Sequence, residues 1–248
     1  RKIALSLASG EYIFFVDGDD FIERDAIARL YQKQQNTGAD IVVGDFFVEY
    51  EDYKVVYTHQ KDLSSEEYFL GLIKRTIPCC IWGKLIRRDL FLKNRIRMVD
   101  RVQLGEDFAI MTQLSYLTQK ITFLGHPVYH YRKTNQQSIM MNLSEQSIDD
   151  LLKVNDVLFN VFGENQEINN QIKLYTKLLF FKQLPTIDLL KTASRIYPET
   201  TIPQSLRIKD RLVLTLADRS HFWLLHNLYQ IYCGLRGIWN FIICSKGH

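Results

Sequence analysis

The chain has 248 residues, of which 46% are hydrophobic and 24% are charged, and this is typical of a globular protein with a sizeable core. Its formal net charge of only +3 gives no reason to expect a nucleic-acid-binding protein. The four cysteines lack the spacing of a zinc site or a disulfide framework, which favours reduced thiols and a cytoplasmic location.

An acidic cluster directly after an apolar run is the most informative feature near the start of the chain. Residues 12–16 are continuously apolar, as in a buried strand, and Gly18 allows the tight turn that follows. Asp17, Asp19 and Asp20 then crowd together where open α/β sheets bind ligands. Carboxylates at this density suit Mg²⁺ or Mn²⁺ that carries substrate phosphates. The alternative is a solvated turn in which Asp20 only caps a helix.

The following segments alternate between strand and helix patterns. We expect helices over 23–35, 64–75, 87–94 and 106–117, strands over 40–44, 121–124 and 128–131, and a hairpin within 46–57. The helix after Ser64 begins with a capping box that ends at Glu67. This alternation predicts an α/β fold with a largely parallel sheet and flanking helices.

Strand signals stop after about Ser138, and helical periodicity covers 144–162, 165–184 and 186–196. We therefore place a boundary between residues 1–141 and a helical C-terminal appendage, 142–248. In the apolar stretch 222–244, polar residues interrupt the pattern too often for a spanning helix, whereas Trp223 and Trp239 are candidate membrane-surface anchors. The alternative is a helix that packs on its own protein or on a partner subunit.

Four motifs occur in an order and at a spacing that resemble family 2 glycosyltransferases with the GT-A fold. They are Arg1 with residues 8–13 and 17–20, residues 81–91, residues 105–107, and residues 129–133 followed by Ser138. The resemblance covers roughly residues 1–140, so it implies that 1–141 is a partial GT-A catalytic domain. It also implies that the first βα units are missing, on the order of 70 residues. Lys2 departs from the family, whose members usually carry Asn there.

The resemblance also implies roles for the acidic residues. Asp19, with Asp17, would hold the divalent cation, and Asp17 would also reach the ribose. Asp107 would be the general base that takes the acceptor proton, and Glu106 would contact a sugar. Without the other motifs, Glu106 and Asp107 would be read only as acidic residues that complement a helix dipole.

Basic and aromatic residues complete the expected substrate site. Arg132 and Lys133 would clamp the diphosphate, Ser138 would donate a hydrogen bond to it, and Arg1 is a further candidate for the same group. Trp82 is a candidate for stacking on a sugar, although ordinary core is an equal alternative. Lys84 is a candidate because a lysine within an apolar run needs a partner.

The resemblance therefore implies an inverting, metal-dependent glycosyltransferase of cell-surface polysaccharide synthesis. Its donor would be a nucleotide-diphosphate sugar, and its acceptor a saccharide or a lipid-linked molecule at the inner face of the cytoplasmic membrane. One alternative is a truncated, inactive remnant that acts as a membrane-associated binding module. Another is a metal-dependent nucleotidyl transferase or hydrolase, which would not need residues 82–84 together with 106–107.

Overall fold

The computed structural model describes residues 1–59, 63–133, 143–184, 186–228 and 230–231. The chain divides into two compact units. Unit 1 comprises residues 1–138 and 153–163, and unit 2 comprises residues 139–152 and 164–248. The expected boundary near residue 142 lies outside the described residues and stays a prediction.

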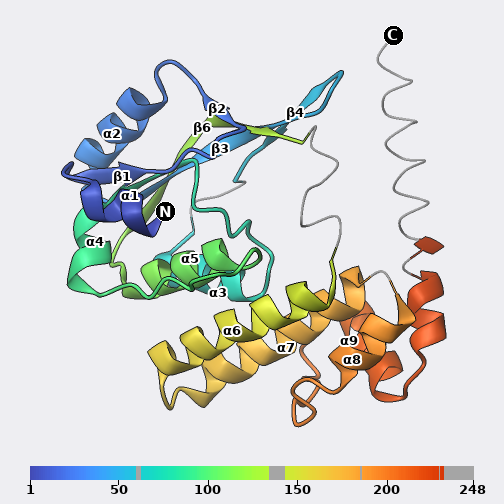
Figure 1. Cartoon of the computed structure of the whole chain (residues 1–248). Coiled ribbons are helices and arrows are strands. Elements are labelled where there is room, and N and C mark those ends of the chain that lie inside the picture. Colours follow the sequence, from blue (N-terminus) through green and yellow to red (C-terminus); the bar gives the residue numbers. More distant parts are fainter. Residues whose placement is uncertain (60–62, 134–142, 185, 229, 232–248) are drawn as a thin grey trace. The chain divides into compact units, whose positions relative to one another are not determined.

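Unit 1 is built on a mixed sheet, whose described strands number six. They are β1 (Tyr12–Phe14), β2 (Phe21–Ile22), β3 (Ile41–Glu49), β4 (Lys54–Tyr57), β5 (Lys84–Arg87) and β6 (Ile121–Arg132). The strand order is β1-β5-β3-β6-β2, and β4 pairs with β3 (Figure 1). The α/β fold class is therefore confirmed.

The expectation of a largely parallel sheet is wrong. Among the described strands only β3 and β6 pair in parallel, whereas β1–β5, β2–β6, β3–β4 and β3–β5 are antiparallel. A continuous apolar run shows that a strand is covered on both faces, but it does not encode the direction of the neighbouring strand. The two expected strands 121–124 and 128–131 form the single strand β6, whose pairing with β3 shifts in register around Asp45.

Helices cover both faces of this sheet (Figure 1). Within residues 1–59 and 63–133 the helices are α1 (Lys2–Leu7), α2 (Ala26–Thr37), α3 (Ser65–Ile73), α4 (Arg88–Lys93) and α5 (Glu106–Leu117). Because side chains alternate along a strand, Ile41 and Val43 of β3 pack with α3 and α5, while Val42 packs with α2. The expected capping box is present, since Ser64 and Glu67 exchange bonds with each other's backbone amides.

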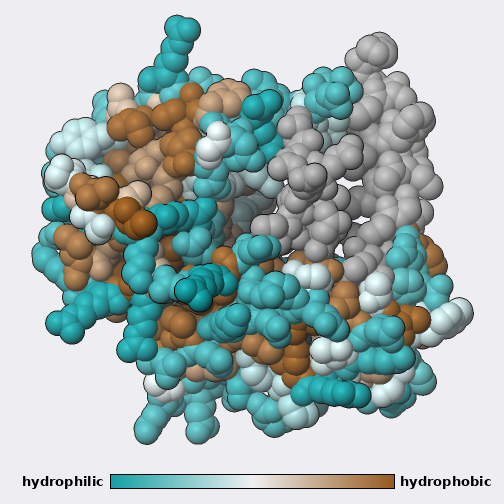
Figure 2. Space-filling view, viewed as in Figure 1, coloured by the Kyte–Doolittle hydropathy of each residue, from teal (hydrophilic) through white to brown (hydrophobic). Residues whose placement is uncertain are grey.

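The helix α1 contributes no buried residue to unit 1. Ile3 is 76% exposed and Leu7 is 79% exposed. Figure 2 shows apolar surface on the side of the unit that carries α1 and α2. Within the described residues β1 is the edge strand next to this surface, because only β5 pairs with it.

Unit 2 is helical in its described part. Besides the first part of α6 (Glu145–Phe162) it holds α7 (Gln166–Gln183), α8 (Ile187–Ser194) and α9 (Ile208–Asp218). Asn165 and Thr186 cap the N-termini of α7 and α8 with their side chains, and Lys182 of α7 pairs with Asp210 of α9 at 2.6 Å. Among the described residues, no helix has both the length and the apolar character needed to cross a membrane. Trp239 lies outside them.

Candidate active site

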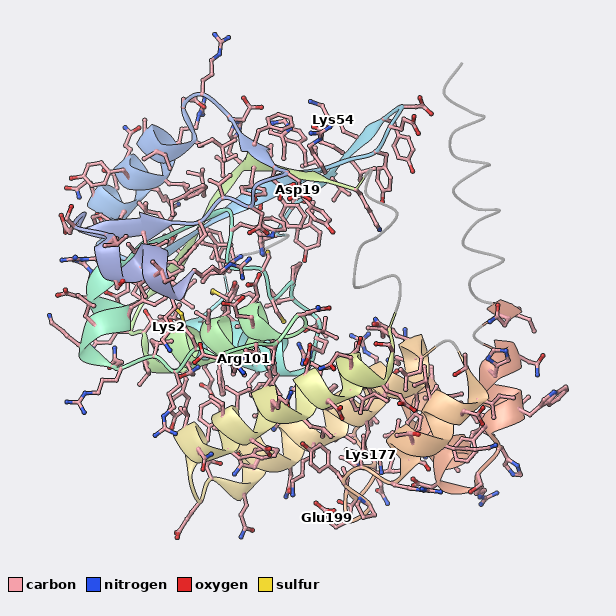
Figure 3. All side chains as sticks on the ribbon, viewed as in Figure 1. Lys2, Asp19, Lys54, Arg101, Lys177 and Glu199 are labelled. Atoms are coloured by element: carbon pink, nitrogen blue, oxygen red, sulfur yellow. The ribbon has the colours of Figure 1, made fainter. Side chains whose placement is uncertain are left out.

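The acidic turn at residues 17–20 is held by hydrogen bonds from the end of β6. The backbone N–H of Asp20 donates to the carbonyl oxygen of Asp17 at 3.1 Å. Tyr129 Oη accepts from the N–H of Asp17 at 3.1 Å and donates to Asp20 Oδ2 at 2.8 Å. Asp20 Oδ1 also accepts from the N–H of Arg132 at 2.8 Å. Asp20 is therefore not a helix cap, whereas Asp19 is exposed beside it (Figure 3).

Arg1 brings the acidic turn and the start of α5 together. Its Nη2 lies 2.9 Å from Asp17 Oδ1, and its Nη1 contacts Asp107 Oδ1 and lies 3.5 Å from Glu106 Oε2. The guanidinium thus neutralises carboxylates from two segments that are about ninety residues apart in the sequence. Four of the residues predicted for the site, Arg1, Asp17, Glu106 and Asp107, meet at this point.

The start of α5 directs Asp107 toward the turn. Gly105 precedes the helix with φ of 89°, a conformation that favours glycine. Asp107 Oδ2 then accepts from the backbone N–H of Ile81 at 3.1 Å, and its other oxygen faces Arg1. Glu106 and Asp107 lie in the first turn, so they also complement the helix dipole.

The segment before β5 packs against Tyr129 through Trp82, and Lys84 of β5 bonds to its backbone carbonyls. The Trp82 ring is buried and stacks on Tyr129 with centroids 4.4 Å apart, and on Tyr131 at 5.4 Å. This geometry favours core packing over direct stacking of Trp82 on a sugar. Lys84 is buried, and its Nζ donates to the carbonyl oxygens of Cys80 and Trp82 at 2.6 and 3.4 Å. Lys84 Nζ also donates to the Cys80 thiol at 3.3 Å and lies 6.0 Å from the centroid of the Trp82 ring, so its contacts are with its own segment.

The expected diphosphate clamp is only partly described. Arg132 and Lys133 follow Tyr129 at the end of β6, and both are exposed. The backbone of Arg132 is bonded to Asp20, and Lys133 Nζ lies 5.6 Å from the ring of Tyr50. Ser138 lies outside the described residues.

A buried histidine on β6, His130, is enclosed by acidic and aromatic side chains. The ring nitrogens of His130 lie 2.5 Å from Glu49 Oε1 and 3.0 Å from Glu23 Oε1. The ring is also stacked between Phe21 and Phe47. These contacts join β2, β3 and β6, and they leave His130 away from the turn contacts of Tyr129.

Sequence reasoning missed the phenol of Tyr129 as a site residue. Burial raises the pKa of Tyr129 well above its ordinary value, so the phenol stays protonated and keeps donating to Asp20. Burial also raises the pKa of Asp20, although the bonds from Arg132 and Tyr129 act in the opposite direction. The position of Tyr129 two residues before Tyr131 indicated a shared face, but nothing local indicated its partners.

The site fits a cation that arrives with a phosphate better than one that the protein holds alone. Among the described residues, no group of three or more His, Cys, Asp or Glu side chains has a geometry that could hold a metal ion. Arg1 engages Asp17, while Tyr129 and Arg132 engage Asp20. The exposed carboxylate of Asp19 therefore remains, and that of Asp17 would join it if Arg1 released it. Mg²⁺ is usually bound by one or two carboxylates together with substrate phosphates.

Comparisons with known proteins agree with this architecture. Residues 1–94 match the family model described as glycosyl transferase family 2. Glycosyltransferase GlyA of Streptococcus pneumoniae is 32% identical over 144 residues, which cover 53% of this chain and 20% of that protein. Cholesterol galactosyltransferase of Borreliella burgdorferi is 27% identical over 209 residues, which cover 76% of this chain and 57% of that protein. The chain thus spans less than two thirds of the length of both relatives.

A solved structure shows the same fold. The fragment 1–349 of TarS from S. aureus, in complex with UDP-GlcNAc, superposes with a TM-score of 0.65. The match covers 94% of this chain and 70% of that one, at 14% sequence identity. The GT-A fold shared with TarS, the family model over residues 1–94 and the similarity to curated glycosyltransferases lead to one conclusion: this chain is similar to the enzymes of glycosyl transferase family 2.

Proposed function

We propose that the protein transfers a sugar from a nucleotide-diphosphate sugar to an acceptor hydroxyl, with inversion, in cell-surface polysaccharide synthesis. The observation that carries the proposal is the meeting of Asp17 and Asp107 at one guanidinium, that of Arg1. A transferase needs a site for the leaving diphosphate next to a base for the attacking hydroxyl. The TarS structure, solved with UDP-GlcNAc, supports a nucleotide-sugar donor.

Asp107 is the proposed general base. Its Oδ2 is fixed by the amide of Ile81, so the carboxylate has a defined orientation before the substrate binds. Its Oδ1 contacts Arg1, a group that an arriving anion would compete for. Glu106, next to it, is proposed to hydrogen-bond a hydroxyl of the donor or acceptor sugar.

Asp19 and Asp17 are the proposed ligands of a divalent cation. When bound, such a cation supplies positive charge to the leaving diphosphate. Arg132, Lys133, Ser138 and Arg1 are proposed to hold the same anion, and the planar guanidinium of Arg132 suits bidentate contact with phosphate. The bond from Arg132 N–H to Asp20 supports this assignment, because it holds the backbone of the clamp beside the acidic turn.

The proposed acceptor is a saccharide or a lipid-linked molecule at the inner face of the cytoplasmic membrane. The Borreliella relative is a cholesterol galactosyltransferase, and its name indicates a lipid acceptor. In this chain Ile208 and Leu212 of α9 are 83% and 53% exposed, and Trp223 is 70% exposed. Arg207, Lys209 and Arg211 lie beside them in the sequence, and this combination suits an anionic membrane surface.

A donor screen on the intact protein tests the proposal. Nucleotide release from a set of nucleotide-diphosphate sugars is measured with and without saccharide acceptors, in Mn²⁺ and in EDTA. Transfer to the acceptor that requires the cation supports the proposal. Nucleotide release that never needs an acceptor would favour the hydrolase alternative, and a protein that binds the membrane without turnover would favour the inactive remnant.

A further inference from the structure

One phenol joins the acidic turn to the end of β6. Tyr129 Oη is an acceptor for the N–H of Asp17 and a donor to the carboxylate of Asp20. The other oxygen of that carboxylate accepts from the N–H of Arg132. A chain of three hydrogen bonds therefore runs from the backbone of Asp17 through two side chains to the backbone of Arg132.

The two side chains of this hydrogen-bond network, those of Tyr129 and Asp20, are restrained by further contacts. The Tyr129 side chain is fully buried, and its ring lies against Trp82 at an interplanar angle of 11°. Asp20 is further restrained by the bond from its own N–H to the carbonyl of Asp17. Hydrogen bonds in such a network polarise one another, so loss of one member weakens the others.

The atoms at the two ends belong to the two groups that the proposed function assigns to the diphosphate. Asp17 and Asp19 lie on the turn, and Arg132, the last residue of the network, is followed by Lys133. Neither Tyr129 nor Asp20 is assigned to the cation or the sugar. Their contacts instead determine where those groups lie before any substrate is present.

We propose that Tyr129 and Asp20 are positioning residues that couple the acidic turn to the clamp at the end of β6. This inference depends on the proposed function for one thing only, the identity of the ligand, which is a diphosphate with its cation. The coupling itself belongs to the free protein. Its consequence is that the two sides of the anion site are ordered together, so that loss of one contact disorders both.

Backbone amide exchange measured by NMR on the ligand-free protein tests the coupling. In Tyr129→Phe the ring still fills its place on Trp82, but the N–H of Asp17 loses its acceptor. We expect this amide to exchange about tenfold faster, the size of one hydrogen bond. The decisive amide is that of Arg132, which Tyr129 does not touch and which we also expect to exchange several-fold faster, by about the same order.

The converse variant is Asp20→Asn, in which the amide of Asp17 should exchange faster although Asp20 does not accept from it. Tyr57→Phe is the matched control, because Tyr57 belongs to the same aromatic cluster and has no recorded bond to the turn. The N–H of Gly44, which bonds to the carbonyl of Gly83 at 3.0 Å, is the internal reference and should not change. Unchanged exchange at Arg132 in Tyr129→Phe would overturn the proposal.

A second measurement separates this inference from the proposed function. Binding of a nucleotide-diphosphate sugar with Mn²⁺ is followed by calorimetry, and kinetics are split into KM and kcat. We expect Tyr129→Phe to raise the donor Kd and KM more than it lowers kcat, with Tyr57→Phe unchanged. Equal donor binding in Tyr129→Phe and the wild type would sink the positioning role. If the wild type binds no donor while the exchange pattern holds, the proposed function fails and the coupling stands.

Discussion

Unit 1 contains two groups of polar and charged side chains whose hydrogen-bonding and ionic partners differ in kind. At the acidic turn, Asp17 and Asp107 are partly exposed and share one cation, the guanidinium of Arg1, and Asp19 is exposed to solvent. In the second group the side chains of Asp45, His59 and Lys84 are buried, and their hydrogen-bond partners include one another, the backbone and the Cys80 thiol. The difference teaches that the site is found where charges are still open to a ligand, and not where they are most deeply buried.

The buried polar group, defined by Asp45, His59 and Lys84, has the features of a structural network. Asp45 Oδ1 accepts from the backbone N–H of His59 and lies 3.0 Å from its Nδ1. Burial lowers the pKa of His59, and Lys84 adds to this effect, while the bond with Asp45 opposes it. His59 is therefore neutral at pH 7 and serves as a donor to Asp45.

The largest effect is expected at the open group. Asp19→Ala should abolish Mn²⁺-dependent transfer while the fold stays intact, because the turn is held by Tyr129 and Asp20 and not by Asp19. Transfer rates are measured with and without Mn²⁺, and circular dichroism follows the fold. Asp52→Ala, at an exposed carboxylate in the β3–β4 turn, is the control. Activity within a few-fold of the wild type would show that the metal assignment is wrong.

The next effect concerns the start of α5. Asp107→Asn should keep donor binding but lower turnover by about 10²-fold or more, as expected for loss of a general base. Donor Kd and kcat are measured on the same preparation, with the exposed Asp100→Asn as the control. If donor affinity fell as much as turnover, Asp107 would instead be a residue that holds Arg1 and the Ile81 loop in place.

The buried polar group should respond in stability rather than in turnover. Lys84→Met keeps the length of the side chain but leaves the carbonyls of Cys80 and Trp82 without their donor, which should lower the free energy of unfolding by about 1–3 kcal/mol. Urea unfolding and kcat of the folded fraction are compared. Unchanged stability with a large loss of kcat would instead assign Lys84 to the active site. The buried polar group would then not be purely structural.

The smallest expected effect is on the pH dependence of stability. The pKa of His59 is lowered in the folded state. As the pH falls, the unfolded chain therefore protonates this histidine first, near the ordinary histidine pKa of about 6.5, and the folded chain does so only at a lower pH. This contribution to stability is present above that pH and is lost as the pH falls through the lowered value. Unfolding midpoints between pH 7.5 and 5 should therefore decrease less in His59→Asn than in the wild type. The same slope in both, with exposed His126→Asn as the control, would contradict the assignment.

Local features were predictable from the sequence, and long-range partners were not. The capping box at Ser64, the hairpin within residues 46–57 and the start of α5 at Glu106 depend on neighbours a few residues away. The antiparallel pairing of β1 with β5 depends on chain segments about seventy residues apart, and no local pattern states it.

The same division applies to the candidate site. The motifs placed Arg1, Asp17, Glu106 and Asp107 in one reaction, and the structure brings these side chains together. Lys84 was selected because a buried lysine needs a partner, but the partners are carbonyl groups, which every residue carries and no pattern distinguishes. Tyr129 was missed because its role depends on the position of a hydroxyl relative to residues more than a hundred positions earlier.

The contact of Arg1 with the carboxylates has a consequence for titrations with free metal ions. The guanidinium is an intramolecular counter-ion, so a cation that binds Asp17 must first displace it. The apparent affinity for the bare ion then contains the free energy of that displacement. A diphosphate offers Arg1 an alternative anion at the same moment. Titrations with Mn²⁺ alone will therefore give weaker binding than titrations in which Mn²⁺ and a nucleoside diphosphate are added together.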